Sequence, residues 1–383
     1  MEYYIDASYK SINKFGEELC GDKVEIIKTE DGTLLVLSDG LGSGVKANIL
    51  ATLTSKIAIT MLKGGATIDE TLETIINTLP ECKVRKLAYS TFTIIKLENN
   101  GDCYMVEYEN PPTFFYRDGC DVSIDRKKRI IKGKTIFESR FKFYPGDLLT
   151  VVSDEAVHAG VGEYLNLGWQ WENINDFLRD ISQKKYATDI TNSLLDVCKT
   201  LYNDKPGDDT TVLSIKFQPV KYLNLFTGPP KNIEDDEKFI KRVGESRGIV
   251  VLSGGTTANI ISKAWNEEIM IDLDGYESNL PPVGYMRGVG LVTEGLLTLN
   301  KTVEYIKEYI YEGHEISSDD GAGVLGRLLL FDVSHINIVA GTAVNPAHQN
   351  PDFPIDFNIK LKVVVELEAI LKTFGKSVTL EYV

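Results

Sequence analysis

The sequence lacks the marks of a secreted or disulfide-bonded protein. Its five cysteines are odd in number, widely scattered, and include no Cys-x-x-Cys pair. This usage fits reduced thiols better than a disulfide framework. The N-terminal stretch MEYYIDASYK has no basic region followed by an apolar core. We therefore expect no signal peptide and a cytoplasmic location.

Basic residues and long apolar runs are also scarce. There are 41 Lys and Arg residues against 56 Asp and Glu residues, and the formal net charge is −15. Nucleic acids and anionic membranes need clustered positive charge, so neither is an expected partner. The most apolar long helical segment, residues 47–62, is interrupted by Lys56 and by several Thr and Ser residues. It falls short of the roughly 20 predominantly apolar residues of a membrane span.

The length of 383 residues indicates two domains, because single hydrophobic cores rarely grow past about 250–300 residues. The pattern of elements changes near Gln218-Pro219. Before this point, strand pairs and paired helices predict a layered α+β sandwich over residues 1–218. After it, strands and helices alternate, which predicts a smaller α/β domain with a mostly parallel sheet over residues 219–383.

Periodicity and turn residues predict the individual elements. In the first domain we expect Thr67 to be a helix N-cap. The expected strands there are 23–28, 33–38, 90–97, 103–108, 113–117, 141–144, 148–152 and 210–217, and the expected helices are 45–62, 67–79, 172–182 and 187–202. In the second domain the expected strands are 222–226, 249–252, 268–273, 335–340 and 376–382, and the expected helices are 235–245, 257–266, 298–310, 320–329 and 359–373.

Three acidic motifs stand where strands of the first domain end or begin. Asp39 and Asp154 close apolar runs, and Asp208 comes just before one. Neighbouring antiparallel strands bring such positions together, so we expect the three acids to meet on one sheet edge. Clustered carboxylates repel one another unless cations hold them, and hard divalent ions prefer oxygen ligands. The motifs therefore predict a Mg²⁺ or Mn²⁺ site, with the bare backbone of Gly40 beside it.

Six separated motifs, taken in order, resemble the metal-dependent PPM Ser/Thr phosphatases in the branch of the stage II sporulation protein E phosphatase. The resemblance covers about residues 10–217 and implies an αββα sandwich with two Mn²⁺ or Mg²⁺ ions at one edge. The motifs are Cys20-Gly21-Asp22, LSDGLGSG (37–44), YSTFTIIKL (89–97), ENPPTFF (109–115), YPGDLLTVVSD (144–154) and PGDDTTVL (206–213).

The resemblance implies a role for each site residue. Asp39 would bridge both ions, the Gly40 carbonyl would bind one of them, and Asp154 and Asp208 would bind the other. Asp22 would orient a metal-bound water from the outer shell. Asp209, next to a ligand, would support the site rather than coordinate. Two such ions activate a water and neutralise charge during in-line attack on phosphorus.

The sequence departs from the family pattern in two places. Leu41 stands where animal-type members of the wider family carry a His, so the general acid is unassigned. Glu155 stands where the family usually has Gly, and it would add a ligand, point away, or disturb a loop that needs positive φ. His158 is a candidate proton donor, although a structural role fits it better. No Ser, Cys or His nucleophile is indicated.

The second domain carries a glycine-rich turn that could bind an anion. Gly254, Gly255, Thr256 and Thr257 lie between an expected strand and helix, and a helix N-terminus of this kind binds phosphate or carboxylate. Asp272 and Asp274 follow the next expected strand, as in a dinucleotide fold. A tight turn with Thr capping the helix is the slightly favoured interpretation of the same residues. Three further segments could line the same crevice: Gly228-Pro229-Pro230, Asp319–Gly323 and Asn345–Pro351.

These features predict a phosphoprotein phosphatase whose substrate would be a regulatory protein such as an anti-sigma-factor antagonist. The second domain would sense a small anionic ligand or a partner. One alternative is a binding module with the phosphatase fold, impaired at Glu155. Another is a second domain that acts on a phosphorylated small molecule. Assembly into a homodimer stays open.

Overall fold

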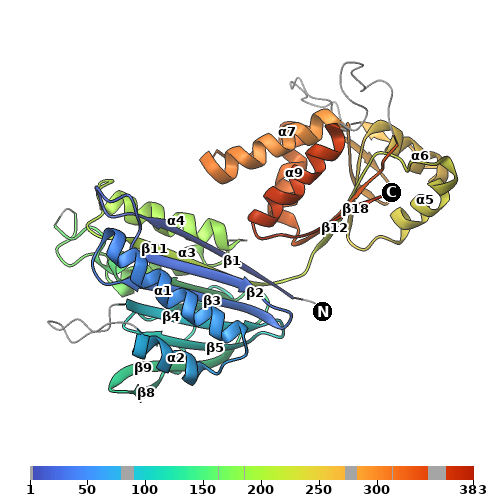
Figure 1. Ribbon diagram of the computed structural model, residues 1–383. Coiled ribbons are helices and arrows are strands. Elements are labelled where there is room, and N and C mark those ends of the chain that lie inside the picture. Colours follow the sequence, from blue (N-terminus) through green and yellow to red (C-terminus); the bar gives the residue numbers. More distant parts are fainter. Residues whose placement is uncertain are drawn as a thin grey trace. The chain divides into compact units, whose positions relative to one another are not determined.

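The computed structural model describes residues 3–78, 90–162, 164–184, 186–271, 283–312, 314–343 and 359–383. The chain divides into two compact units, Met1–Pro219 and Val220–Val383. Figure 1 shows both, and each is described here by itself.

The first unit is built on two antiparallel sheets. Their strand orders are β1-β11-β10-β6-β7 and β2-β3-β4-β5-β9-β8. The five-stranded sheet contains β1 (Tyr3–Ile12), β6 (Phe114–Arg117), β7 (Cys120–Asp121), β10 (Leu148–Val152) and β11 (Thr210–Pro219). The six-stranded sheet contains β2 (Asp22–Lys28), β3 (Gly32–Gly40), β4 (Ser90–Glu98), β5 (Asp102–Tyr108), β8 (Lys127–Ile131) and β9 (Lys134–Lys142).

The period of two along β3 explains the layers of this unit. Leu35 and Leu37 join a core cluster with residues of both sheets, including Val151 of β10. Leu34 and Val36 point to the opposite face and pack with residues of α1 (Gly44–Lys63) and α2 (Ile68–Thr78). The helices α3 (Trp171–Ile181) and α4 (Ala187–Leu201) cover the other sheet in the same way. The expected αββα sandwich is confirmed.

The helix α1 is longer than the sequence predicted. It has 20 residues and, within the described part of the chain, is the one helix long and apolar enough to cross a membrane by length and composition. The expectation that this segment falls short was therefore wrong. In this unit α1 packs on β2 and β3 and buries Ala47, Ala51 and Ala58.

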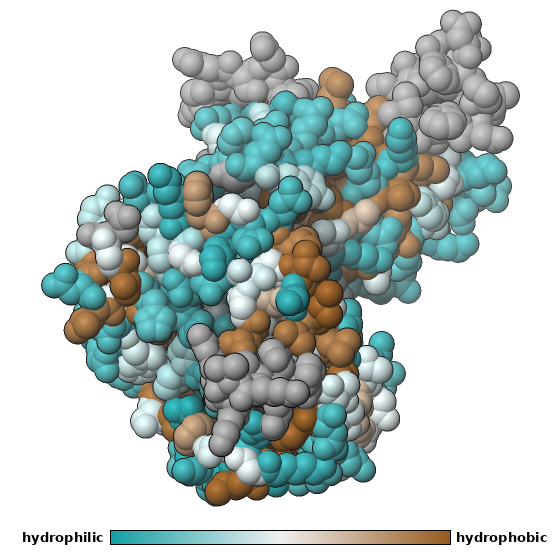
Figure 2. All heavy atoms as spheres, turned by 60° about the vertical axis from the view of Figure 1, so that its left-hand side comes forward, coloured by the Kyte–Doolittle hydropathy of each residue, from teal (hydrophilic) through white to brown (hydrophobic). Residues whose placement is uncertain are grey.

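The exposed side of α1 also carries apolar residues. Val45, Ile49 and Leu53 recur every fourth residue and are 62%, 56% and 42% exposed. Figure 2, which shows one face of the molecule, has hydrophobic groups scattered between hydrophilic side chains. Exposed apolar side chains are usual on protein surfaces.

Thr67 confirms one local prediction. Its hydroxyl accepts a hydrogen bond from the Glu70 N–H at 3.2 Å, and its own N–H donates to Glu70 Oε2 at 2.8 Å. This reciprocal pair is a capping box, so the N-cap was correctly predicted.

The second unit has one seven-stranded sheet in the order β14-β15-β16-β13-β12-β17-β18. The strands are β12 (Tyr222–Thr227), β13 (Ile249–Ser253), β14 (Met270–Ile271), β15 (Gly284–Met286), β16 (Val289–Thr293), β17 (His335–Ala340) and β18 (Ser377–Tyr382). Neighbouring strands are parallel from β13 through β12 and β17 to β18. The mostly parallel sheet that the sequence predicted is confirmed.

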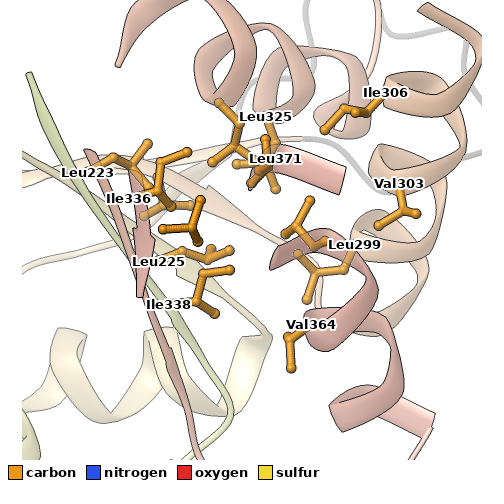
Figure 3. Packing of buried hydrophobic residues seen from close by; sticks show 14 of the residues in the cluster. Leu223, Leu225, Leu299, Val303, Ile306, Leu325, Ile336, Ile338, Val364 and Leu371 are labelled. Carbon is orange, nitrogen blue, oxygen red and sulfur yellow. The ribbon is translucent and has the colours of Figure 1, made fainter. Parts of the chain in front are cut away.

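Helices cover both faces of this sheet. On one face α5 (Asp236–Glu245) and α6 (Gly255–Trp265) share a core with β12 and β13. On the other lie α7 (Leu296–Lys307), α8 (Gly321–Arg327) and α9 (Ile359–Thr373). Figure 3 shows Leu225 and Ile338 of the sheet facing Leu299 and Val364 of these helices.

One expected strand of the second unit was wrong. The described part of this range, residues 268–271, contains only the two-residue strand β14, which pairs antiparallel with β15 at the sheet edge. The second parallel neighbour of β13, on the side away from β12, is β16, which the sequence analysis missed. Glycines at 288 and 290 weaken its strand signal, because glycine inside a strand has no side chain to pack. Asp272, Asp274 and residues 345–351 lie outside the described residues.

Candidate metal and phosphate site

The pairing of β2 with β3 places Asp22 directly opposite Asp39. The Asp22 side chain is only 4% exposed, and neither of its carboxylate oxygens has a hydrogen-bond partner among the described residues. The hydroxyl groups of Ser153 and Thr211 lie near this carboxylate and lower its pKa, against the larger effect of burial. Ser153 Oγ accepts from the Thr211 N–H at 2.8 Å, and the Thr211 hydroxyl lies 2.7 Å from that of Ser11.

Burial and neighbouring negative charge act together on Asp39. Desolvation raises the pKa of its carboxyl group most. The charges of Asp22, Asp154 and Asp208 raise it further, as does a hydrogen bond with Asp154. The pKa of Asp22 is likewise raised, first by burial. The structure therefore brings together four of the acids that the sequence singled out.

These acids do not share one sheet edge as the sequence analysis expected. Asp39 ends β3 in the six-stranded sheet, whereas Asp154 follows β10 and Asp208 precedes β11 in the five-stranded sheet. The stacking of the two sheets, rather than pairing within one of them, brings the strand ends together. Sequence spacing alone does not reveal which strands share a sheet.

The backbone around Gly40 is tightly packed. A Cβ atom at this position would lie 2.0 Å from the Ala47 carbonyl oxygen in the first part of α1. Gly42 and Gly44, which follow it, have φ values of 107° and 64°. The N-cap residue Ser43 makes no capping hydrogen bond, and the first turn of α1 carries no acidic residue, although the Glu17 carboxylate lies 3.3 Å from Ser43 Oγ. The glycines thus bring the end of β3 close to the uncapped, partly positive end of a helix.

Asp209 has a structural role that differs from that of its neighbour Asp208. Its Oδ1 accepts from the Lys14 N–H at 3.0 Å, and its Oδ2 accepts from the Gly21 N–H at 2.8 Å. The carboxylate is 5% exposed and holds the segment that leads into β2. Asp209 therefore positions Asp22 through the backbone next to it.

Glu155 does not occupy a strained backbone position. It lies in the 3₁₀ helix Asp154–His158 and is not among the residues with positive φ. The Tyr202 hydroxyl lies 2.6 Å from the Glu155 carbonyl oxygen and 3.0 Å from Oε1. Burial first, and then Asp154 and Asp208, raise the pKa of its side chain. The loop distortion that the sequence analysis left open is thereby excluded, while a fifth carboxyl group stands near the site.

Tyr202 was missed by sequence reasoning. It is 47 residues from Glu155 and carries no motif that links the two. Only the docking of α4 onto the five-stranded sheet brings its hydroxyl to the site.

Other candidate groups fit ordinary roles. His158 is exposed at the end of the 3₁₀ helix. Cys198 is fully buried in the core of α4, and burial raises the pKa of its thiol to about 12. A thiol of that pKa is protonated at neutral pH and is a poor nucleophile.

The donor set suits a hard divalent cation, because it consists of carboxylate oxygens and a backbone carbonyl. In the described residues, no group of three or more His, Cys, Asp or Glu side chains is already drawn together closely enough to hold an ion. The buried oxygens of Asp22 without partners and the mutual repulsion at Asp39 are nevertheless what positive charge would relieve.

Comparison with known families decides the identity of this unit. The model of the stage II sporulation protein E (SpoIIE) family matches residues 29–218. Residues 29–218 are a SpoIIE-family PPM phosphatase domain. No curated protein matches the chain.

Solved structures similar to the chain include phosphatases of this family. The SpoIIE phosphatase domain of Bacillus subtilis is 18% identical, with a TM-score of 0.44, and the match covers 56% of this chain and 93% of that one. A Bacillus subtilis SpoIIE structure with a fragment of its regulatory domain is 17% identical, with a TM-score of 0.49, covering 57% and 64%. The RsbU and RsbW domains of a Mycobacterium tuberculosis protein are 17% identical, with a TM-score of 0.46, covering 63% and 67%.

The glycine-rich turn of the second unit does not lie at the switch point of its sheet, where a dinucleotide fold has it. The strand order of this sheet reverses between β12 and β17, where a ligand crevice is usual. Here the loops after these strands touch, and a Cβ atom at Gly341 would lie 2.0 Å from the Pro229 carbonyl oxygen. Gly254 and Gly255 follow the neighbouring strand β13 instead. Asp320 is an ordinary N-cap, since its Oδ1 accepts from the Gly323 N–H at 2.8 Å.

Proposed function

We propose that the SpoIIE domain is a metal-dependent protein phosphatase that hydrolyses phosphoserine or phosphothreonine in a bacterial signalling protein. The observation that carries the proposal is the crowding of Asp22, Asp154 and Asp208 around Asp39, which raises the pKa of the Asp39 carboxyl group. Carboxylates that gather in this way, with Asp22 buried and Asp39 half-buried, repel one another without cations, and their oxygen donors suit Mn²⁺ or Mg²⁺.

Each acid then has a separate task. Asp39, the Gly40 carbonyl, Asp154 and Asp208 would hold two ions. When bound, such ions supply an activated water and positive charge for the phosphoryl oxygens. The buried carboxylate of Asp22 would accept a hydrogen bond from the attacking water. The uncapped N-terminus of α1 would favour the phosphate group nearby.

The substrate class follows from the family. We propose a phosphorylated regulatory protein, of the kind represented by anti-sigma-factor antagonists. The bound serine or threonine would need no covalent enzyme intermediate, since the candidate site holds no activated nucleophile in the part of the chain that the structure describes.

The first test measures metal binding and turnover together. Mn²⁺ is titrated calorimetrically into the full chain, and hydrolysis of p-nitrophenyl phosphate is followed at each concentration. Asp39→Asn is expected to abolish Mn²⁺ binding and to lower kcat/KM by at least about 100-fold, because it removes the central carboxylate. Asp31→Asn, which changes an exposed acid in a hairpin turn, is the control and is expected to match the wild type. Equal turnover in Asp39→Asn would contradict the proposed site.

The second test separates the enzyme from an impaired binding module. Glu155 is held by Tyr202 outside the set of proposed ligands, so Glu155→Gln is expected to change kcat/KM by less than about threefold. An inactive wild type that gains turnover in Glu155→Gly would favour the impaired module. If neither protein hydrolyses the ester at any Mn²⁺ concentration, the phosphatase activity itself is ruled out.

A further inference from the structure

Two helices of the second unit begin side by side at one edge of its sheet. Ser253 and Thr293 are register partners at the ends of β13 and β16, and the Gly254 N–H donates to the Thr293 carbonyl at 2.9 Å. A Cβ atom at Gly295 would lie 3.4 Å from the Cα atom of Gly254. The N-termini of α6 and α7 therefore meet at a pair of glycines with little side-chain cover.

The two helix ends differ in how they are capped. Oε2 of Glu294 accepts from the N–H groups of Leu297 and Thr298 at 3.2 and 3.4 Å, so α7 has an anion of its own. In contrast, among the described residues no side chain caps α6, and its first turn contains no acidic residue. The first N–H groups of α6 are thus the ones that remain available to an external acceptor.

Three threonines in or next to the ends of these elements have buried hydroxyl groups without a hydrogen-bond partner among the described residues. They are Thr257, Thr293 and Thr298, which are 0%, 3% and 1% exposed. The Thr257 oxygen lies on the Gly254 side of α6, 3.7 Å from where a Cβ atom of Gly254 would be. Buried hydroxyls are nearly always hydrogen-bonded, and one left unsatisfied is costly. This grouping indicates a ligand that accepts hydrogen bonds.

We infer that the start of α6, with the Thr257 hydroxyl, binds the phosphate group of a small phosphorylated metabolite. A phosphate accepts several hydrogen bonds and carries the charge that a helix N-terminus favours. Gly254 and Gly255 let it approach the backbone, since a Cβ atom at Gly255 would meet nothing within 4 Å. The inference rests on the second unit alone and does not depend on phosphatase activity.

The test is calorimetric and thermal-shift titration of the full chain with inorganic phosphate, AMP and glucose 6-phosphate. A chelator is present throughout, so that no metal holds phosphate in the SpoIIE domain. We expect saturable binding and a higher melting temperature of the second unit with at least one phosphate monoester. AMP and glucose 6-phosphate distinguish a nucleotide from a sugar phosphate as the preferred source of the group.

Two variants give results that a purely structural role would not. Thr257→Val removes an unsatisfied hydroxyl at constant shape, so it should raise the melting temperature without ligand and weaken binding by about tenfold or more. Gly255→Asp places a carboxylate in the first turn, which stabilises the helix but competes with the phosphate. It should abolish binding and also leave the unliganded unit at least as stable.

Thr302→Val is the matched control. The Thr302 hydroxyl is also fully buried but donates to the Thr298 carbonyl at 2.8 Å. Its loss should lower the melting temperature and leave phosphate binding unchanged. The inference is overturned if none of the three ligands binds the wild type, or if Thr257→Val and Gly255→Asp bind as tightly as the wild type does.

Discussion

At the scale of residues, the SpoIIE domain places acids where their charges oppose one another. Asp22 is buried, and the negative charges of Asp22, Asp154 and Asp208 raise the pKa of Asp39. Asp209 shows the contrasting solution, because two backbone N–H groups satisfy its carboxylate. Asp209 thus has a structural role, whereas Asp22 and Asp39 carry negative charge that a bound cation can neutralise.

The raised pKa values of Asp22 and Asp39 predict how the metal-free protein responds to pH. In the unfolded chain the pKa of an Asp carboxyl group is about 3.9. Above that pH the folded chain keeps protons that the unfolded chain has released, so stability falls as the pH rises toward the raised folded pKa values. With a chelator present, the melting temperature of the SpoIIE domain should decrease between pH 5 and pH 8.

Asp39→Asn isolates this effect, because it removes the group whose ionisation is most opposed. Its melting temperature should vary less with pH than that of the wild type, whereas Asp31→Asn should keep the wild-type slope. Saturating Mn²⁺ should raise the wild-type melting temperature most at the higher pH. Equal slopes in wild type and Asp39→Asn would show that the acids do not repel one another as described.

At the scale of elements, the contact between the end of β3 and α1 fixes the site. Gly40→Ala would drive a Cβ atom to within 2.0 Å of the Ala47 carbonyl oxygen. The backbone of α1 has to move, and we expect a loss of about 3 kcal/mol in the free energy of unfolding of the SpoIIE domain. Urea unfolding followed by circular dichroism measures this loss.

Gly255→Ala is the control for this substitution, because it adds a Cβ atom in open space at the start of α6. It should be neutral or stabilising by up to about 1 kcal/mol. A Gly40→Ala variant as stable as the wild type would mean that the strand and the helix are not so close.

Sequence reasoning succeeded where local signals are strong. The apolar run of β3 and the capping box at Thr67 define their own elements, and Asp39, Asp154 and Asp208 were recognised because each adjoins such a run. β1 was missed because its pairing partner, β11, is about 200 residues away, from Tyr3 opposite Pro219 to Ile12 opposite Thr210. Long-range pairing also decides which sheet holds each acid, and no local pattern encodes it.

At the scale of the whole molecule, the two units have separate hydrophobic cores. The core of the SpoIIE domain includes Leu35, and that of the second unit includes Leu225. Both side chains are fully buried. Units with their own cores can unfold as independent cooperative transitions.

Calorimetry of the full chain should therefore resolve two transitions. Leu35→Ala should lower only the one that Mn²⁺ raises, and Leu225→Ala only the other, each by about 2–5 kcal/mol of unfolding free energy. A single transition that moves with either substitution would contradict the division at Pro219.

The direct contact between the loops after β12 and β17 also bears on how this protein can change by mutation. A Cβ atom at Gly341 would collide with the carbonyl oxygens of Gly228 and Pro229, which are main-chain atoms that no rotamer change can move aside. In a library randomised at codon 341 and selected for a folded second unit, glycine should be almost the sole survivor. The place where related architectures diversify their ligands is therefore closed to variation here, and new specificity would have to arise at the edge between β13 and β16.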